Sequence, residues 1–283
     1  MFFWGFSFIW SNQVLKSGVP VYALVFFRMA IAGALLLAFT LATRQLEMPR
    51  RKDLKWFLLL ALAEPFLYFI GETFGMKLTA SPTLCSVVIA TIPIFSMVFA
   101  MSVYREKVSK PNMAGIFLTL PGICIVVFEN GFGRIEHPAG MAMLFVAVFS
   151  AVGYSLVVKK LADKYNSITI NTWQHVVGAL YFLPLFFSMD YQTVKTLPFT
   201  WELVRPILLL AIFCSCLCYY LFINTIRELG VSRTSTFTSL IPVITAVGAF
   251  LLGAENLPVQ KIVGIAVVVT GLVLSQYTGD KSK

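Results

Sequence analysis

The chain has 283 residues, of which 58% are hydrophobic and only 12% are charged, and its mean hydropathy is +0.83. A soluble domain carries about 25% charged residues, so this composition excludes a soluble globular protein and makes the lipid bilayer the expected surroundings. The net charge of +9 would favour a nucleic-acid partner in a soluble protein. In a membrane chain the basic residues report orientation instead, and we expect no nucleic-acid partner.

Ten apolar segments follow one another along the chain, separated by short polar, proline or glycine segments. Most are close to the ~20 residues with which a helix crosses a bilayer, and they are too long and too uniformly apolar for barrel strands. We therefore predict an all-α membrane protein with ten transmembrane helices. The predicted spans are 1–15, 21–42, 54–75, 82–104, 111–128, 139–158, 168–188, 203–225, 233–252 and 258–277.

The first span is interpreted as a membrane helix and not as a cleavable signal peptide. No basic segment precedes it, and no small-residue cleavage site follows it. At 1.5 Å per residue it would be about 22 Å long, which is short for a full crossing and compatible with a start upstream of Met1.

Lysine and arginine are distributed unevenly between alternate loops. With the N-terminus in the cytoplasm, fifteen of them lie in the inward segments and six in the outward segments. Because basic residues are enriched in cytoplasmic loops, we predict a multi-pass protein of the bacterial inner membrane with both termini in the cytoplasm.

An internal repeat is visible as matched residues at a constant offset of 149 positions. The matched pairs are Pro93 and Pro242, Glu106 and Glu255, Gly115 and Gly264, and Gly122 and Gly271. The offset indicates two repeats of five helices, and an odd number of crossings turns the second half upside down. Inverted repeats are common in secondary transporters. We predict a first repeat over 1–128, a second over 139–277 and a cytoplasmic tail over 278–283.

The same residues carry a family resemblance. The segment from Leu78 to Pro93, continued by Tyr104-Arg-Glu-Lys-Val-Ser109 and Gly115, resembles the hallmark segment of the EamA family of the drug/metabolite transporter superfamily. Trp4-Gly-Phe-Ser-Phe and Phe27-Arg28 resemble its first-helix and second-helix motifs. The second half repeats the hallmark in Gly230-Val-Ser232, Ile241-Pro242 and Gly253-Ala-Glu255.

The resemblance spans nearly the whole chain. It implies a ten-helix transporter, with both termini cytoplasmic, that moves small metabolites, often amino acids, outward by alternating access. The third helix departs from the family pattern, because Glu64-Pro65 and Glu72 stand where many members have small or aromatic residues.

Glu64 lies near the middle of the third span, where a charged side chain costs roughly 2.5–3.5 kcal/mol on insertion scales. Tyr68 and Glu72 follow at steps of four, so the three lie along one side of a helix, and Pro65 can kink the helix there. We predict a site for a substrate amine or a proton on this side. The alternative is a structural ion pair, with Arg28 as the partner of Glu64.

Arg28 lies about seven residues into the second span, roughly 10 Å deep. We predict a packing or gating role for it, with a contact to a substrate carboxylate as the alternative. Pro93 and Pro242 occupy equivalent points of two spans that are rich in small hydroxyl residues. Small residues allow helices to approach closely and proline loosens the backbone. We predict that these two spans rock during access switching; simple packing is the alternative.

The seventh span opens with polar residues that include Trp173 and His175. Because histidine titrates near neutrality, His175 could join a proton path; a structural, hydrogen-bonded histidine is the alternative. Trp173 would line a cavity or anchor the membrane interface. Weaker candidates of the same kind are Tyr154, Tyr219, Tyr220 and Asn224.

Glu106 and Glu255 each precede the next helix by a few residues, where an acidic group suits a helix N-terminus, and we interpret them as structural. The five cysteines lie in apolar runs with no histidine or acidic residue beside them, so we interpret them as small packing residues and predict no metal site. No nucleophile or phosphate-binding motif occurs in the sequence.

We therefore expect a secondary transporter that exports a small organic metabolite, either amino-acid-like or cationic, and not an enzyme. Multidrug or cation efflux and uptake are the alternatives. An intramembrane enzyme is less favoured, because Glu64 with His175 is its only candidate catalytic pair. We expect no cofactor, with proton coupling left open, and either a monomer or a homodimer.

Overall fold

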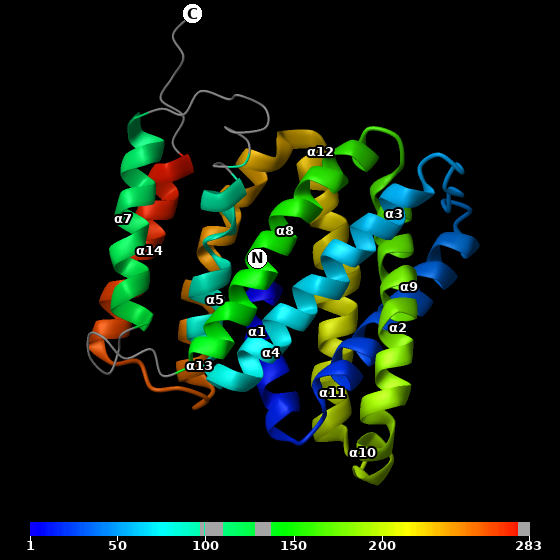
Figure 1. Cartoon of the computed structure of the whole chain (residues 1–283), viewed down its shortest axis with the longest axis horizontal. Coiled ribbons are helices and arrows are strands. Elements are labelled where there is room, and N and C mark those ends of the chain that lie inside the picture. The colour runs from blue at the N-terminus through cyan, green and yellow to red at the C-terminus, as the bar shows by residue number, and fades with distance from the viewer. Residues whose placement is uncertain (97–98, 100–109, 128–136, 277–283) are drawn as a thin grey trace, which may run out of the picture.

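The computed structural model describes residues 1–96, 99, 110–127 and 137–276. Within these residues every regular element is a helix, and the helices pack side by side in one bundle (Figure 1). The N-terminal part contains α1 (Phe2–Lys16), α2 (Val21–Ala42), α3 (Leu54–Ala61), η1 (Leu62–Leu67), α4 (Tyr68–Thr79), α5 (Pro82–Ile89) and α7 (Lys110–Val127). The C-terminal part contains α8 (Pro138–Ala162), α9 (Ser167–Leu185), η2 (Phe186–Asp190), α10 (Tyr191–Thr196), α11 (Trp201–Leu209), η3 (Leu210–Cys218), α12 (Tyr219–Thr236), η4 (Phe237–Leu240), α13 (Ile241–Leu251) and α14 (Val259–Gln276).

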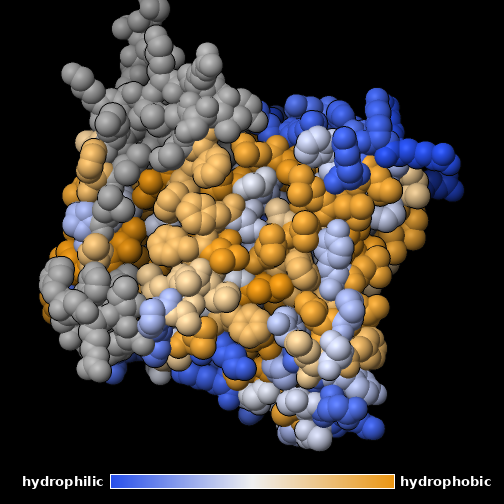
Figure 2. Space-filling model, in the orientation of Figure 1, coloured by the Kyte–Doolittle hydropathy of each residue, from blue (hydrophilic) through white to orange (hydrophobic). Residues whose placement is uncertain are grey.

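Four helical stretches in the described residues are long and apolar enough to cross a membrane. They are Val21–Ala42, Leu54–Thr79, Pro138–Ala162 and Trp201–Glu228. Shorter apolar helices cover Pro82–Ser96, Phe117–Val126, Ile241–Leu251 and Val259–Leu274. Large hydrophobic side chains on the outside support a lipid-facing surface: Phe117 is 68% exposed and Leu251 75%. Figure 2 shows the apolar colour across the middle of this face and hydrophilic patches toward its upper right and lower edges.

Helices lie in all ten predicted spans over the described residues, and α2 begins and ends where the sequence predicts. The segment 189–202, which separates the seventh and eighth predicted spans, contains the short helix α10. Its Val194 is buried in an apolar cluster, which stabilises a short helix of otherwise polar residues. The end of the fourth predicted span, Glu106 and the predicted tail 278–283 lie outside the described residues.

Glycine allows the helices that frame the centre of the bundle to approach closely. An ideal Cβ on Gly71 of α4 would lie 2.5 Å from the carbonyl oxygen of Met143 in α8, and one on Gly33 of α2 would lie 3.3 Å from the backbone of His175 in α9. Small residues at such crossings are typical of membrane helix packing. The α4–α8 pair lines the cavity described next, and α2 contributes Arg28 to the wall of that cavity.

Candidate functional site

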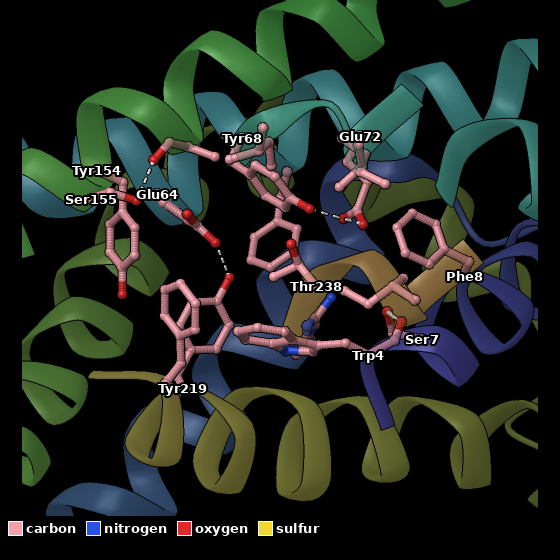
Figure 3. Close-up of a pocket in the computed structure, with 18 residues that line it drawn as sticks. Trp4, Ser7, Phe8, Glu64, Tyr68, Glu72, Tyr154, Ser155, Tyr219 and Thr238 are labelled. Atoms are coloured by element: carbon pink, nitrogen blue, oxygen red, sulfur yellow. Dashed lines mark hydrogen bonds between the residues drawn. The ribbon is translucent and has the colours of Figure 1, made fainter. Parts of the chain in front are cut away.

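A cavity of about 710 Å³, which we call the central cavity, lies inside the bundle (Figure 3). Seven of its eighteen lining residues are aromatic, and its wall contains two carboxyl groups and one guanidinium group. Such a concave, mostly apolar site with a few polar groups is typical of small-molecule binding. The lining residues are Trp4, Ser7, Phe8, Arg28, Glu64, Tyr68, Phe69, Glu72, Ile89, Ala90, Ile92, Ala151, Tyr154, Ser155, Tyr219, Phe222, Thr238 and Ile241.

Glu64 reaches the central cavity at a break in its helix. Residues Leu62–Leu67 form the wide turn η1, and Glu64 has non-helical backbone angles of φ −143° and ψ 117°. Pro65 has no backbone N–H to donate, and the Ser150 hydroxyl donates to the carbonyl of Ala63 at 2.5 Å. One carbonyl at the break is thus satisfied by α8. The break at Glu64 is therefore a kink between two helices, at the point where the side chain reaches the cavity.

The two glutamates each accept a hydrogen bond from a tyrosine. The hydroxyl of Tyr219 donates to Oε1 of Glu64, and that of Tyr68 donates to Oε1 of Glu72 at 3.4 Å (Figure 3). Both glutamates are only 7% exposed. A carboxylate offers about four acceptor sites, so each has capacity for a further donor. Glu64, Tyr68 and Glu72 all line the cavity.

Arg28 faces the same cavity without pairing with either glutamate. Its Nε donates to the Ser215 hydroxyl at 2.9 Å, and its guanidinium lies 4.3 Å from the centre of the Phe69 ring. Across the residues that the structure describes, no basic side chain lies within 4.0 Å of the carboxyl oxygens of Glu64 or Glu72. The alternative of a Glu64–Arg28 ion pair is therefore not what this structure contains.

The rings of His175 and Tyr154 both contact the ring of Tyr219. His175 is fully buried; its Nδ1 bonds to the carbonyl of Asn171 at 2.9 Å, and its ring meets that of Tyr219 edge-on at 5.4 Å. Because a carbonyl only accepts, Nδ1 carries the proton. Tyr154 lines the cavity and donates to Oε1 of Gln174 at 3.0 Å. His175 therefore belongs to the layer of residues behind the cavity wall.

Trp173 is not part of the central cavity. Its Nε1 donates to the carbonyl of Glu47 at 3.1 Å, in the connection between α2 and α3. Of the two predicted roles, this position corresponds to an anchor near the end of the bundle. Trp4, by contrast, lines the cavity, and its Nε1 donates to the carbonyl of Cys214 at 3.3 Å.

The two hallmark prolines occupy matching positions. Pro93 is the second residue of a helical turn, 92–96, that follows a break at residues 90–91, and Pro242 is the second residue of α13, which follows η4. Proline is well tolerated there because the first turn of a helix leaves its N–H groups unpaired. Neither proline lines the central cavity.

Glu255 contacts a second helix besides the one that we expected. Its Oε1 accepts the backbone N–H of Thr83 at 3.4 Å, at the start of α5, and its Oε2 lies 4.0 Å from Nζ of Lys261. The acidic group thus serves the N-terminus of α5 in the other half of the chain, and not only that of the helix that follows it.

Ser215 and Asn171 are site-supporting residues to which the sequence assigned no role. Asn171 Nδ2 donates to the carbonyls of Ser215 at 3.3 Å and Cys216 at 2.9 Å, both within the wide turn η3. Cys214 and Cys216 contact backbone carbonyls through their thiols. No group of metal-ligating side chains occurs among the described residues.

The sequence profile of the EamA-like transporter family matches residues 1–128 and 138–277. The chain belongs to this family. A protein of Archaeoglobus fulgidus named an uncharacterized transporter is 26% identical over 96% of this chain and 94% of its own length. The uncharacterized transporter YetK of Bacillus subtilis is 24% identical over 93% of this chain and 81% of its own length. A solved crystal structure, 18% identical, superposes with a TM-score of 0.69 over 96% of this chain and 94% of that chain, which shows the same fold.

Membership of the EamA family, together with the apolar helices, makes this chain a multi-pass membrane transporter. The family predicted from the sequence motifs is confirmed. The central cavity of this protein is the candidate binding site for the transported molecule.

Proposed function

We propose that this EamA-family protein is a secondary transporter that exports a small organic metabolite, amino-acid-like or cationic, by alternating access. One observation carries the proposal. Two buried glutamates face a cavity with seven aromatic residues in its wall, and no cation of the described chain lies within 4.0 Å of their carboxyl groups. An intramembrane carboxyl in such a position is by default a functional group that needs a partner.

The chemistry of the wall suits an amine. An ammonium group would donate to the free acceptor sites of Glu64 and Glu72, and the faces of Trp4 and Tyr219 attract a cation within about 6 Å. Arg28 lies on the same cavity, and its guanidinium is suited to bind a carboxylate. The combination fits an amino acid better than a molecule that carries only positive charge.

Inverted repeats are supported by the contact between α7 and α14. An ideal Cβ on Gly122 would lie 3.0 Å from the carbonyl oxygen of Gly264, and one on Gly271 would lie 2.8 Å from that of Gly115. A two-fold axis that exchanges Gly115 with Gly264 would also exchange Gly122 with Gly271. It would therefore convert the contact between Gly122 and Gly264 into the contact between Gly271 and Gly115. Reciprocity of this kind is what a two-fold axis produces.

The helix breaks support the same arrangement. The wide turn η1 interrupts the third helical stretch and η3 interrupts the eighth, while residues 90–91 and η4 interrupt the fourth and ninth. Broken helices at matching places in two halves are typical of secondary transporters. We propose that the segments after Pro93 and Pro242 rock against the rest, and that Glu64 couples transport to protons.

We further propose that the protein lies in the bacterial inner membrane, that both termini are in the cytoplasm and that transport is outward. Labelling of single cysteines placed in 43–53 and in 189–202 should modify the two segments from opposite sides of the membrane. Labelling from one side would overturn the topology. Multidrug efflux and uptake remain alternatives within transport.

Transport of labelled amino acids, amines and organic cations into proteoliposomes, with and without a pH gradient, tests the function. Glu64→Gln should lower kcat/KM about 10- to 100-fold, since hydrogen bonds to charged groups contribute about 1.5–3 kcal/mol. Glu228→Gln is the matched control, because Glu228 is exposed. A folded Glu64→Gln protein with unchanged rate and pH dependence would refute the site.

A further inference from the structure

A second cavity, of about 660 Å³, lies between the α1–α2 connection, α2, α10 and α11. We call it the apolar cavity, because its wall is made only of apolar residues: Val19, Phe27, Ile31, Val194, Leu197, Pro198, Phe199, Leu203, Val204 and Ile207. A wall without polar groups offers an ordered water no partner. Hydrocarbon is the ligand chemistry that it fits.

The apolar cavity lies at the end of the bundle where α1 ends and α11 begins, beside α10 (Figure 1). Phe199, which lines it, and Trp201 next to it are each 67% exposed. Exposed aromatic side chains at helix ends are typical of the boundary between hydrocarbon and headgroups. The mouth of the cavity is therefore placed where the acyl chains of one leaflet meet their headgroups.

Three exposed cations flank the apolar cavity. Lys16, Lys195 and Arg205 each stand within three positions of a lining residue. They are half of the six basic residues that the sequence predicts on this side of the membrane. Two carboxylates are also close in sequence. Glu202 is exposed, whereas Asp190 is buried and its Oδ2 accepts the backbone N–H of Ala23 at 2.8 Å. The exposed charge around the mouth is therefore net positive.

We propose that the apolar cavity binds one acyl chain of an anionic phospholipid, whose phosphate lies among Lys16, Lys195 and Arg205. The acyl chain fills the apolar cavity, and the three cations pair with the phosphate of the headgroup at the leaflet surface. The site is separate from the central cavity and does not depend on the transported molecule.

The bound lipid contacts the helix that also carries part of the central cavity. Phe27 and Ile31 of α2 line the apolar cavity, and Arg28 between them lines the central cavity. Phe27 also meets Phe186 edge-on at 5.3 Å, and this contact joins the wall to η2, which continues α9. A lipid in the apolar cavity therefore packs against the side of α2 that carries Phe27 and Ile31, and restricts the movement of this helix.

The test uses the purified, delipidated full chain in detergent. Dioleoyl phosphatidylglycerol and dioleoyl phosphatidylcholine are titrated separately, and binding is followed by native mass spectrometry and by the melting temperature. We expect tighter binding of the anionic lipid. Near a membrane surface each basic residue contributes about 1 kcal/mol to such attraction, so neutralising two should weaken binding roughly 25-fold. The double variant is K195Q/R205Q, and the binding of phosphatidylcholine should not change.

Two further variants separate this site from general attraction. R51Q/K52Q removes the same charge from exposed positions in the connection between α2 and α3 and should leave anionic-lipid affinity unchanged. Val204→Phe fills the apolar cavity and should displace the lipid while the charges remain. Equal affinity for the two lipids, or an equal loss of affinity in K195Q/R205Q and R51Q/K52Q, would overturn the proposal. Because binding is measured without transport, failure here leaves the transport function standing.

Discussion

Gly71→Ala tests the close packing of α4 against α8, which sets the width of the central cavity. The added Cβ would lie 2.5 Å from the carbonyl oxygen of Met143 and 2.7 Å from the backbone nitrogen of Ala147, whereas ordinary contact begins at 3.4 Å. Both neighbours are backbone atoms of a helix and cannot rotate away. The two helices must therefore move apart by about 0.9 Å, the difference between 3.4 Å and 2.5 Å.

Overpacking of this kind costs about 1–3 kcal/mol in a close-packed interior. The movement also reaches the site, because α4 carries Tyr68 and Glu72 while α8 carries Tyr154. We expect a lower melting temperature together with weaker substrate binding. The melting temperature can be followed with a thiol-reactive dye, since Cys85, Cys214 and Cys218 are buried until the protein unfolds.

Gly153→Ala is the matched control on α8. An ideal Cβ on Gly153 meets nothing within 4 Å, so alanine should stabilise the helix by about 0.5–1 kcal/mol through its lower unfolded-state entropy. The two substitutions are thus expected to change the melting temperature in opposite directions. If Gly71→Ala melts at or above the temperature of Gly153→Ala, the inferred contact between α4 and α8 is wrong.

Three further predictions concern the hydrogen bonds of single side chains. The Lys164 ammonium donates to the Asp53 carboxyl at 2.7 Å and the Tyr165 hydroxyl donates to it at 3.0 Å, and together they hold its pKa below the ordinary value. The pair between Lys164 and Asp53 should therefore stabilise the protein fully above a pH of about 3.9, the pKa of an unperturbed Asp. This stabilisation should be lost as the pH falls through the lower folded-state pKa. Melting curves of the wild type and Asp53→Asn should therefore converge in acid, and a constant difference between them would contradict the pair. Tyr219→Phe removes the donor to the buried Glu64 and should destabilise the protein by the ~1.5–3 kcal/mol of a hydrogen bond to a charged group. An unchanged melting temperature argues against the bond. Asn171→Leu leaves two carbonyls of η3 without their side-chain donor and should destabilise the protein by about 1–3 kcal/mol, more than Thr172→Val, which loses only a bond within its own helix.

Local sequence patterns predicted the parts of this structure that depend on one helix at a time. Apolar length gave the helical stretches, and a spacing of four placed Glu64, Tyr68 and Glu72 on one side, where the structure has all three lining the central cavity. The hallmark residues were sufficient to identify the family. Such patterns are informative because each helix satisfies its own backbone hydrogen bonds in the membrane. The residues that share one side of a helix can therefore be predicted from its own sequence, without knowledge of the neighbouring helices.

Contacts between helices were harder to predict. The sequence offered an ion pair between Glu64 and Arg28 as the alternative to a binding site, yet Arg28 bonds to Ser215 and lies over the Phe69 ring. Ser215 stands in an apolar, cysteine-rich run and Phe69 is one of 26 phenylalanines, so neither carries a distinctive local signal. Helical periodicity determines which side chains share a face, but not which face of another helix they meet.

The two wide turns explain why the polar groups of the central cavity meet at one place. At η1 the freed carbonyl of Ala63 accepts from Ser150, and at η3 the carbonyls of Ser215 and Cys216 accept from Asn171. Irregular backbone at membrane depth is tolerated where it is buried in protein or lines a cavity. Glu64 lies in the first turn and Tyr219 directly follows the second, so their hydrogen bond joins the two breaks across the cavity. Any motion that separates the two halves must therefore act on this bond, and a substrate amine that takes over Glu64 would release it.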